Sequence, residues 1–381
     1  MADPPVRTID PWPSPAPAGE PLLPPIVAAS IFTSDEDQPP GYSYGREGNP
    51  TWTALEQAFG GLERGHAVVF ASGMAASLAL LLALVEDRSR RVVMGDDGYF
   101  NIRTQVSRLG RLIEARFVDL DDDASLGKEM EGRPAALWVE TPSNPLLRCY
   151  DLDRLASTAG QVGAALVVDN TLATPALQRP LDHGATASIY SLTKAASGHS
   201  DVVAGAVVTR DQALWDRLRS WRTLSGGILG PFEAWLVLRG LKTLELRVTH
   251  QSASAERLAR HLDQHPAVRR VHYPALGSRQ PFLDAQMPSG CGPMLSFEVA
   301  GDAQAAAAVV AGSTRIRPAT SFGGVHSTWE RRARWPSEVA PESLIRLSVG
   351  IEDPALLTAD LDRALGVLES PTRAWVGEVS H

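Results

Sequence analysis

The stretch Ala165-Leu166-Val167-Val168-Asp169-Asn170-Thr171 passes from an apolar run to an acid, an amide and a hydroxyl. A short valine-rich run that stops at polar residues is typical of a strand buried on both faces of a parallel sheet. Helical spacing follows other runs of the same kind, as in residues 151–162. The pattern predicts an α/β fold with a mainly parallel sheet covered by helices. The other runs that we interpret as strands of this sheet are residues 67–70, 91–94, 136–140 and 204–208.

A lysine follows this strand in the segment Ser191-Leu192-Thr193-Lys194. Ligands of open α/β sheets bind beyond the carboxyl ends of the strands, so Asp169 and this segment are expected to share a site. A lysine, a buried carboxylate and a hydroxyl-rich loop are the groups that a protein needs to hold pyridoxal 5'-phosphate (PLP). Lys194 would form the Schiff base, Asp169 would pair with the pyridinium nitrogen, and Ser191 and Thr193 would bind the phosphate. The alternatives are a surface lysine in a polar loop and an aspartate that caps a helix or turn.

Two further loops are expected to contribute to this site. Ser72-Gly73-Met74 leads into an apolar helix, where Gly73 lets the backbone approach closely and the first helical amides can bind a phosphate. Tyr99 follows a predicted strand, and its ring could stack on a flat cofactor while its hydroxyl relays protons. The simpler interpretations are a strand–helix turn made of small residues and a loop tyrosine that packs its ring.

Composition and charge restrict the class of protein. The chain has 381 residues, 44% of them hydrophobic, and a formal net charge of -8, so a nucleic-acid or anionic-membrane partner is not expected. The basic run at 330–334 is interpreted as a solvated helix face, and the acidic run at 119–123 as a solvated turn. The cysteines form no disulfide framework, and the histidines show no metal-ligand spacing. The start of the chain lacks the features of a signal peptide and the longest apolar run, 75–85, is too short to span a bilayer, so a cytoplasmic protein is expected.

The sequence divides into three parts. Residues 1–45 begin with a proline-rich stretch and are interpreted as an extended arm. Residues 46–245 carry the α/β pattern and would form the PLP-binding domain. Residues 246–381 have a different pattern, which predicts a smaller α+β domain. Its expected elements are helices near residues 241–265 and 303–311 and strands at 271–273, 294–299 and 344–349.

Several segments together resemble the Cys/Met metabolism family of PLP-dependent enzymes, also called the trans-sulfuration family, which includes the cystathionine γ-lyases and γ-synthases. The resemblance covers nearly the whole chain after residue 40. It implies fold type I of the PLP-dependent transferases. The segments that carry the resemblance are residues 42–51, 70–76, 138–145, 231–244 and 344–352.

The resemblance also implies roles for particular residues. Tyr44 and Arg46 would reach the phosphate site of a neighbouring subunit, which implies a homo-oligomer, a dimer at least and more usually a tetramer. Arg346 would clamp the substrate α-carboxylate with its bidentate fork. Asn144 would contact the PLP ring hydroxyl or the substrate, and Ser321 would contact the substrate. The remaining cofactor contacts that the resemblance implies are those of Ser72, Gly73, Met74, Tyr99, Asp169, Ser191, Thr193 and Lys194.

The implied substrate is a small sulfur amino acid. We predict γ-elimination on cystathionine, which gives cysteine, 2-oxobutanoate and ammonia, with Lys194 and Tyr99 as the catalytic residues. The alternatives are γ-replacement on an activated homoserine by a γ-synthase or sulfhydrylase, then β-elimination of cystathionine, and an inactive scaffold with the same fold. The sequence does not separate these reactions, because Thr320, Phe322 and residues 326–335 depart from the family pattern where the distal part of the substrate would bind. Arg103 follows Phe100-Asn101-Ile102 rather than the usual glycine pair, so it is not assigned as a second substrate arginine.

Overall fold

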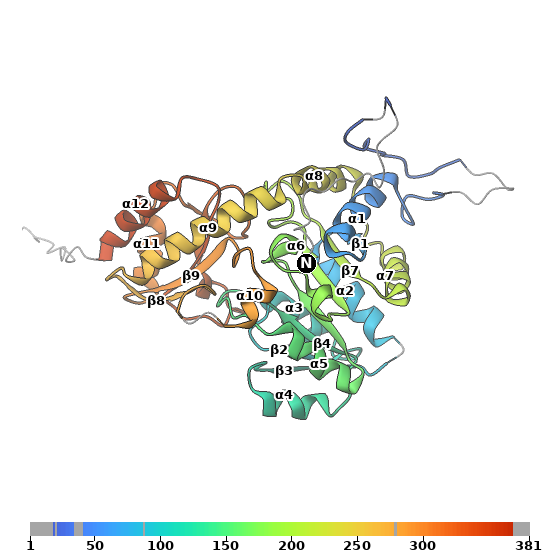
Figure 1. Cartoon of the computed structure of the whole chain (residues 1–381), viewed down its shortest axis with the longest axis horizontal. Coiled ribbons are helices and arrows are strands. Elements are labelled where there is room, and N and C mark those ends of the chain that lie inside the picture. The colour runs from blue at the N-terminus through green and yellow to red at the C-terminus, as the bar shows by residue number, and fades with distance from the viewer. Residues whose placement is uncertain (1–17, 20, 34–40, 87, 278–279, 369–381) are drawn as a thin grey trace, which may run out of the picture.

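The computed structural model describes residues 18–19, 21–33, 41–86, 88–277 and 280–368, and these residues form two β-sheets. The larger sheet has seven strands in the order β1-β7-β6-β5-β4-β2-β3, and the smaller has five in the order β10-β11-β12-β9-β8. Helices cover both sheets, and α9 extends from one sheet to the other (Figure 1). This arrangement confirms the predicted α/β fold class.

The larger sheet is mainly parallel. Strands β2 to β6 run in one direction, and β7 lies antiparallel between β6 and β1. Strands β4 and β5 are buried along their whole length, which explains their continuous apolar sequences. The register places Phe70, Asp169 and Ser191 at the same edge of the sheet. The strands are β1 (His66–Phe70), β2 (Arg91–Gly95), β3 (Glu114–Val118), β4 (Ala136–Glu140), β5 (Ala165–Asp169), β6 (Ala187–Ser191) and β7 (Gly205–Thr209).

Helices pack on both faces of this sheet. One face is covered by α1 and α8 near β7 and by α4 and α5 near β4, and the other face by α2, α3 and α7. Ser72 caps the start of α2, whose alanines and leucines are buried between the sheet and α7. The helices are α1 (Pro50–Glu63), α2 (Gly73–Val85), α3 (Phe100–Arg108), α4 (Asp123–Met130), α5 (Leu152–Val162), α6 (Thr174–Leu177), α7 (Gln212–Ser225) and α8 (Pro231–Leu241), with the 3-10 turn η1 at Pro180–His183.

The apolar pattern does not predict β3 and β6. Strand β3 lies at the edge of the sheet with most of its side chains in water, so its sequence is polar. Strand β6 is central, but the buried Ser188 interrupts its apolar run. The predicted strands of this sheet correspond to β1, β2, β4, β5 and β7, which are confirmed.

The smaller sheet is antiparallel except where β10 meets β11. Its apolar face packs under α9, α11 and α12. The predicted helix near residues 241–265 corresponds to α9, which begins at Leu244, because α8 ends at Leu241. The elements are α9 (Leu244–Asp263), β8 (Val268–His272), α10 (Phe282–Gln286), β9 (Met294–Val299), α11 (Ala303–Gly312), β10 (Arg317–Pro318), β11 (Thr328–Arg331), η2 (Arg332–Arg334), β12 (Leu344–Ser348), α12 (Pro354–Leu365) and η3 (Gly366–Leu368).

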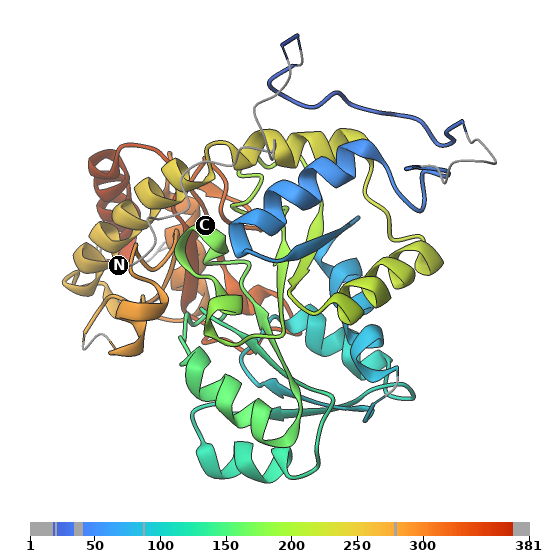
Figure 2. The same ribbon diagram turned by 45° about the vertical axis from the view of Figure 1, so that its right-hand side comes forward.

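Residues 21–33 run along the outside of α1 and α8 without forming a helix (Figure 2). Trp235 Nε1 donates to the carbonyl oxygen of Pro24 at 3.2 Å, and the amide of Val27 donates to Thr51 Oγ1 at 3.0 Å. Residues 1–17, 20 and 34–40 of the expected arm lie outside the described residues. The division into domains remains our proposal. The first turns of α9 pack in the core of the larger sheet and its later turns in that of the smaller, so we keep the boundary near residue 245.

Candidate active site

A cavity of about 470 Å³ opens at the carboxyl edge of the larger sheet, where the smaller sheet faces it. The loops after β1, β2, β4, β5 and β6 form one wall, and the segments before and within β12 form the other. This position is the one expected for a ligand of an open α/β sheet. Most of the predicted site residues line the cavity, namely Ser72, Gly73, Met74, Tyr99, Asn144, Asp169, Ser191, Thr193, Lys194, Ser321 and Arg346.

Tyr44 and Arg46 do not line this cavity. Tyr44 is 44% exposed, and the guanidinium carbon of Arg46 lies 5.3 Å from the centre of the Tyr44 ring. Arg46 Nη1 donates to the carbonyl oxygen of Thr223, at the end of α7, at 3.0 Å. The chain's own cavity is therefore formed without the two residues that the resemblance assigns to a neighbour's phosphate.

Lys194 lies just beyond the end of β6, and its amine points into the cavity. Its Nζ donates to Ser321 Oγ at 2.7 Å and lies 5.0 Å from the centre of the Phe322 ring. The pKa of Lys194 is lowered to about 8, chiefly by burial and then by the cations Arg346 and Arg332, with Glu330 opposing them. A lysine with a lowered pKa is more often a neutral amine at physiological pH, which is the form that reacts with an aldehyde.

Asp169 is the last residue of β5 and is 8% exposed. Its Oδ1 accepts a hydrogen bond from the amide of Thr171 at 3.0 Å. Burial raises the pKa of the Asp169 carboxyl, while the hydrogen bonds from Thr171 lower it. A cation in front of a buried carboxylate stabilises its charged form, so a protonated pyridine ring nitrogen and Asp169 would stabilise each other.

The turn between β1 and α2 has the form of a phosphate cradle. Ser72 Oγ accepts from the amide of Ala75 at 3.0 Å and so begins the helix. A Cβ on Gly73 would lie 3.0 Å from Ser191 Cβ, so glycine lets this turn approach β6 closely. The N-terminus of α2, Ser191 and Thr193 line the same cavity, and the Thr193 hydroxyl is hydrogen-bonded to the backbone of Ala204. Helix amides and hydroxyls suit a phosphate, so these residues fit the phosphate of PLP.

Glu140 is a site residue that the sequence analysis does not assign. It ends β4 beside Asp169, lines the cavity and accepts from the amide of Tyr99 at 2.6 Å. Burial, together with the nearby Asp169, raises the pKa of Glu140 well above its usual range. The Tyr99 hydroxyl accepts from Asn101 Nδ2 at 2.7 Å. Glu140 therefore fixes the backbone from which the Tyr99 ring enters the site.

Arg346, in β12, is 4% exposed and forms the opposite wall. Its Nη1 donates to Asn144 Oδ1 at 2.9 Å, and its Nη2 donates to the carbonyl oxygen of Ser321 at 3.1 Å. Ser321 has a φ of 80°, which is uncommon for a residue other than glycine. In this conformation Ser321 contacts Arg346 through its carbonyl and Lys194 through its hydroxyl.

The interpretation of residues 330–334 as a solvated helix face is wrong. Glu330 lies in β11, and Arg332 begins the short turn η2. Both side chains are buried and paired with each other at 2.7 Å, and Arg332 and Trp335 line the cavity. A run of charged residues normally predicts a solvent-exposed segment. The apolar pattern does not indicate that a carboxylate and an arginine will be buried as a pair.

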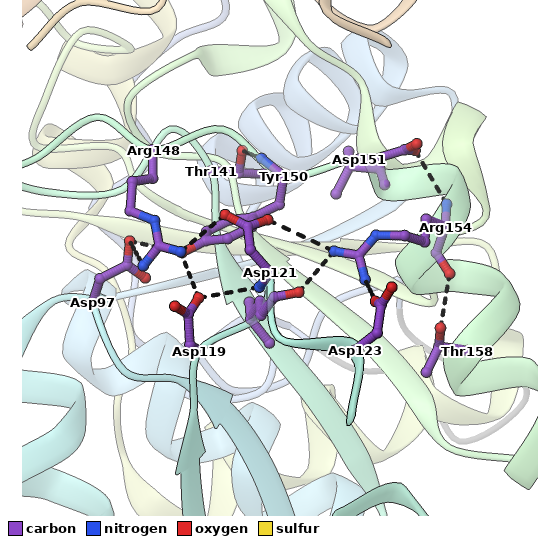
Figure 3. Close-up of polar contacts among 12 residues, drawn as sticks. Asp97, Asp119, Asp121, Asp123, Thr141, Arg148, Tyr150, Asp151, Arg154 and Thr158 are labelled. Carbon is purple, nitrogen blue, oxygen red and sulfur yellow. Dashed lines mark hydrogen bonds and ion pairs between the residues drawn. The ribbon is translucent and has the colours of Figure 1, made fainter. Parts of the chain in front are cut away.

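The acidic run at 119–123 is a solvated turn, as predicted, but it is held by two arginines (Figure 3). Arg148 Nη2 pairs with Asp119 and Asp121, and Arg154 Nη1 pairs with Asp123 at 2.7 Å. Close to these ion pairs, the Tyr150 hydroxyl donates to Asp97 Oδ2 at 2.8 Å. This bond ties the loop that carries Asn144 to the turn that carries Tyr99.

Arg103 donates to the carbonyl oxygen of Asp96 at 2.8 Å and does not line the cavity. Among the described residues, no group of three or more histidine, cysteine, aspartate or glutamate side chains could hold a metal ion. Within the same part of the chain, no helix is long and apolar enough to cross a membrane.

A lysine, a buried aspartate and the N-terminus of a helix, all at the carboxyl edge of a mainly parallel sheet, are the arrangement expected of a PLP site. Residues 14–366 match the family described as Cys/Met metabolism PLP-dependent enzyme, and the chain belongs to this family. The match confirms the resemblance, the enzyme class and the cofactor predicted from the sequence.

Individual relatives cover nearly the whole chain. It is 43% identical to a putative cystathionine γ-lyase of Streptomyces coelicolor over 91% of this chain and 89% of that protein. The crystal structure of the cystathionine γ-lyase CalE6 from Micromonospora echinospora matches with a TM-score of 0.86 and 39% identity, covering 93% of this chain and 96% of that one. That of the cystathionine γ-synthase from Xanthomonas oryzae pv. oryzae in complex with cystathionine matches with a TM-score of 0.89 and 36% identity, covering 95% and 96%. The relatives thus include both lyases and synthases of one family.

Proposed function

We propose that the protein catalyses γ-elimination on cystathionine, which yields cysteine, 2-oxobutanoate and ammonia. The observation that carries this proposal is the 43% identity to a putative cystathionine γ-lyase over nine-tenths of the chain. The cavity is consistent with an amino-acid substrate, because it combines a lysine of lowered pKa with a buried arginine.

The proposed roles follow from where each side chain lies. Arg346 binds the substrate α-carboxylate, and Asn144 and Ser321 hold Arg346 in place. Lys194, hydrogen-bonded to Ser321 Oγ, removes the α-proton as a general base. Tyr99 and Lys194 are the candidates for carrying protons at the β-carbon and to the leaving sulfur.

PLP, when bound, supplies an aromatic system that accepts the electron pair left on the α-carbon. Asp169 would hold the proton on the ring nitrogen, and Asn144 would contact the ring hydroxyl or the substrate. We assign the phosphate to the turn after β1 and the segment after β6. The residues proposed to hold the phosphate are Ser72, Gly73, Met74, Ser191 and Thr193.

The first alternative is γ-replacement, in which a thiol adds to an activated homoserine. The observation in its favour is the structural match to a γ-synthase crystallised with cystathionine. This reaction uses the same residues around Lys194 and Arg346 and differs in what happens at the distal part of the substrate. β-Elimination of cystathionine is the second alternative.

Product analysis separates these reactions. We expect the PLP-loaded protein to convert cystathionine alone into cysteine and 2-oxobutanoate. Homocysteine with pyruvate would instead establish β-elimination, and turnover only of an O-acylhomoserine with cysteine would establish γ-replacement. Lys194→Ala is the control, and it should lose both turnover and the visible absorption of the bound cofactor.

We also propose that the active form is a dimer at least, and a tetramer built from two such dimers. The support for this proposal is that Tyr44 and Arg46 lie outside the chain's own cavity, on the outer surface near α7. A cytoplasmic location stays a prediction.

A further inference from the structure

Glu330 is a buried carboxylate at the meeting point of the basic groups in the cavity wall. Its side chain is 2% exposed. It lies in β11 directly opposite Arg346 of β12. Glu330 Oε1 accepts from Arg346 Nη2 at 2.7 Å, Arg332 Nη1 at 2.7 Å and Thr320 Oγ1 at 3.2 Å. Oε2 accepts from Trp335 Nε1 at 3.1 Å and forms an ion pair with Arg334 Nη2 at 2.8 Å.

Glu330 completes the set of contacts that orient Arg346. The Nη2 group of Arg346 has two N–H bonds, which point to Glu330 and to the carbonyl oxygen of Ser321. Its Nη1 donates to Asn144. A long side chain anchored on several sides has already lost its rotamer freedom, so a ligand that binds to it loses less entropy.

Glu330 also separates two cations. Arg346 and Arg332 both line the cavity, and burial, together with the nearby Arg332, lowers the pKa of Arg346. The shared oxygen of Glu330 bonds to both guanidinium groups, and Glu338 pairs with the far side of Arg332. Without Glu330 the positive charges of Arg346 and Arg332 would repel each other with no shared carboxylate between them. This repulsion would displace the Arg346 side chain.

We propose that Glu330 is a positioning residue for the reaction, which acts on the substrate α-carboxylate through Arg346. The inference rests on the proposed function only for the role of Arg346. Glu330 itself does not contact the substrate. It fixes the orientation of the Arg346 guanidinium. Through the same carboxylate it also bonds to Arg332 and Trp335, which lie on the same wall of the cavity.

Glutamine at this position tests the role at constant size. Its side chain offers one carbonyl oxygen, so its amide nitrogen would point donors either at Arg346 and Arg332 or at Arg334 and Trp335. In either orientation the network loses charge-assisted bonds. Glu342→Gln is the matched control, because Glu342 pairs with Arg331 of the same strand at 2.6 Å but lies at the surface.

The experiment compares two ligands that differ only in a carboxylate. Glycine and methylamine are titrated into the PLP-loaded protein, and binding is followed by the change in visible absorption. We expect Glu330→Gln to raise the Kd of glycine by about 10-fold or more, and to change the Kd of methylamine by no more than about 2-fold. Glu342→Gln should leave both values unchanged. An unchanged Kd for glycine, or an equal loss for both ligands, would overturn the proposal.

Glu330→Asp provides a second variant should the glutamine variant fail to fold. Aspartate keeps the charge but is shorter by one methylene, so it cannot reach both pairs of donors, and the same carboxylate-dependent loss is expected. The binding test needs no turnover. A protein that binds glycine through Arg346 but does not cleave cystathionine would contradict the proposed function and leave the role of Glu330 standing.

Discussion

At the scale of single residues, Glu63 is a buried acid that the proposed reaction does not use. It ends α1 and is fully buried. The pKa of Glu63 is raised to about 8, chiefly by burial, with Ser188 opposing the rise and the nearby Asp182 adding to it. The folded protein therefore keeps a proton there that the unfolded chain releases near pH 4.5.

We predict that Glu63 makes the protein less stable as the pH rises. Its contribution is fully present below the unfolded pKa, decreases by about 1.4 kcal/mol per pH unit above it, and is lost once the pH passes about 8. Glu63→Gln should remove this slope, so its Tm relative to the parent protein should rise between pH 5 and pH 8. The exposed Glu131, after α4, supplies the control variant Glu131→Gln. Parallel Tm curves for the parent and Glu63→Gln would show that Glu63 is ionised in the folded protein.

At the scale of elements, the start of α2 depends on its close approach to β6. Alanine at Gly73 would place a methyl group 3.0 Å from Ser191 Cβ and 3.3 Å from Ser191 Cα, so the turn would have to move. We expect Gly73→Ala to raise the Kd of PLP for the cofactor-free protein by about 10-fold, because overpacking of this size costs about 1–3 kcal/mol. Titration of PLP followed by visible absorption measures this. Gly61→Ala, in α1, has open space around the new methyl group and should bind PLP as the parent does.

The sequence predicts the elements whose burial follows from the apolar residues of the segment itself. Strand β5 is apolar because both its faces are buried, and Asp169 marks the point where it meets the cavity. Strands β6 and β11 are not predicted, because each carries a polar side chain that is buried. Glu330 of β11 is buried against Arg346 from another strand, and an apolar pattern predicts burial of apolar residues but not the pairing of charged ones. Lys194 and Arg346 could be named from family motifs, but their contacts through Ser321 could not.

At the scale of the whole molecule, the proposed assembly makes each active site depend on two chains. Lys194 and Asp169 line the cavity of their own chain, whereas Arg46 lies outside it. If Arg46 serves a neighbour's phosphate, a Lys194→Ala chain paired with an Arg46→Ala chain forms one site with both defects and one with neither. Random mixing at equal amounts should then restore about a quarter of the parent activity, because half of the dimers are hybrids with one intact site each.

The matched control mixes Lys194→Ala with Asp169→Asn. Both defects lie in the same chain's cavity, so every hybrid site carries one of them and the mixture should stay as inactive as its components. The measurement is the rate of 2-oxobutanoate release after the two variants are unfolded, mixed and refolded together. Rescue in the first mixture but not in the second requires that Arg46 acts across a subunit boundary. A mixture of Lys194→Ala and Arg46→Ala that is no more active than Arg46→Ala alone at half the concentration would show that Arg46 does not act across the subunit boundary.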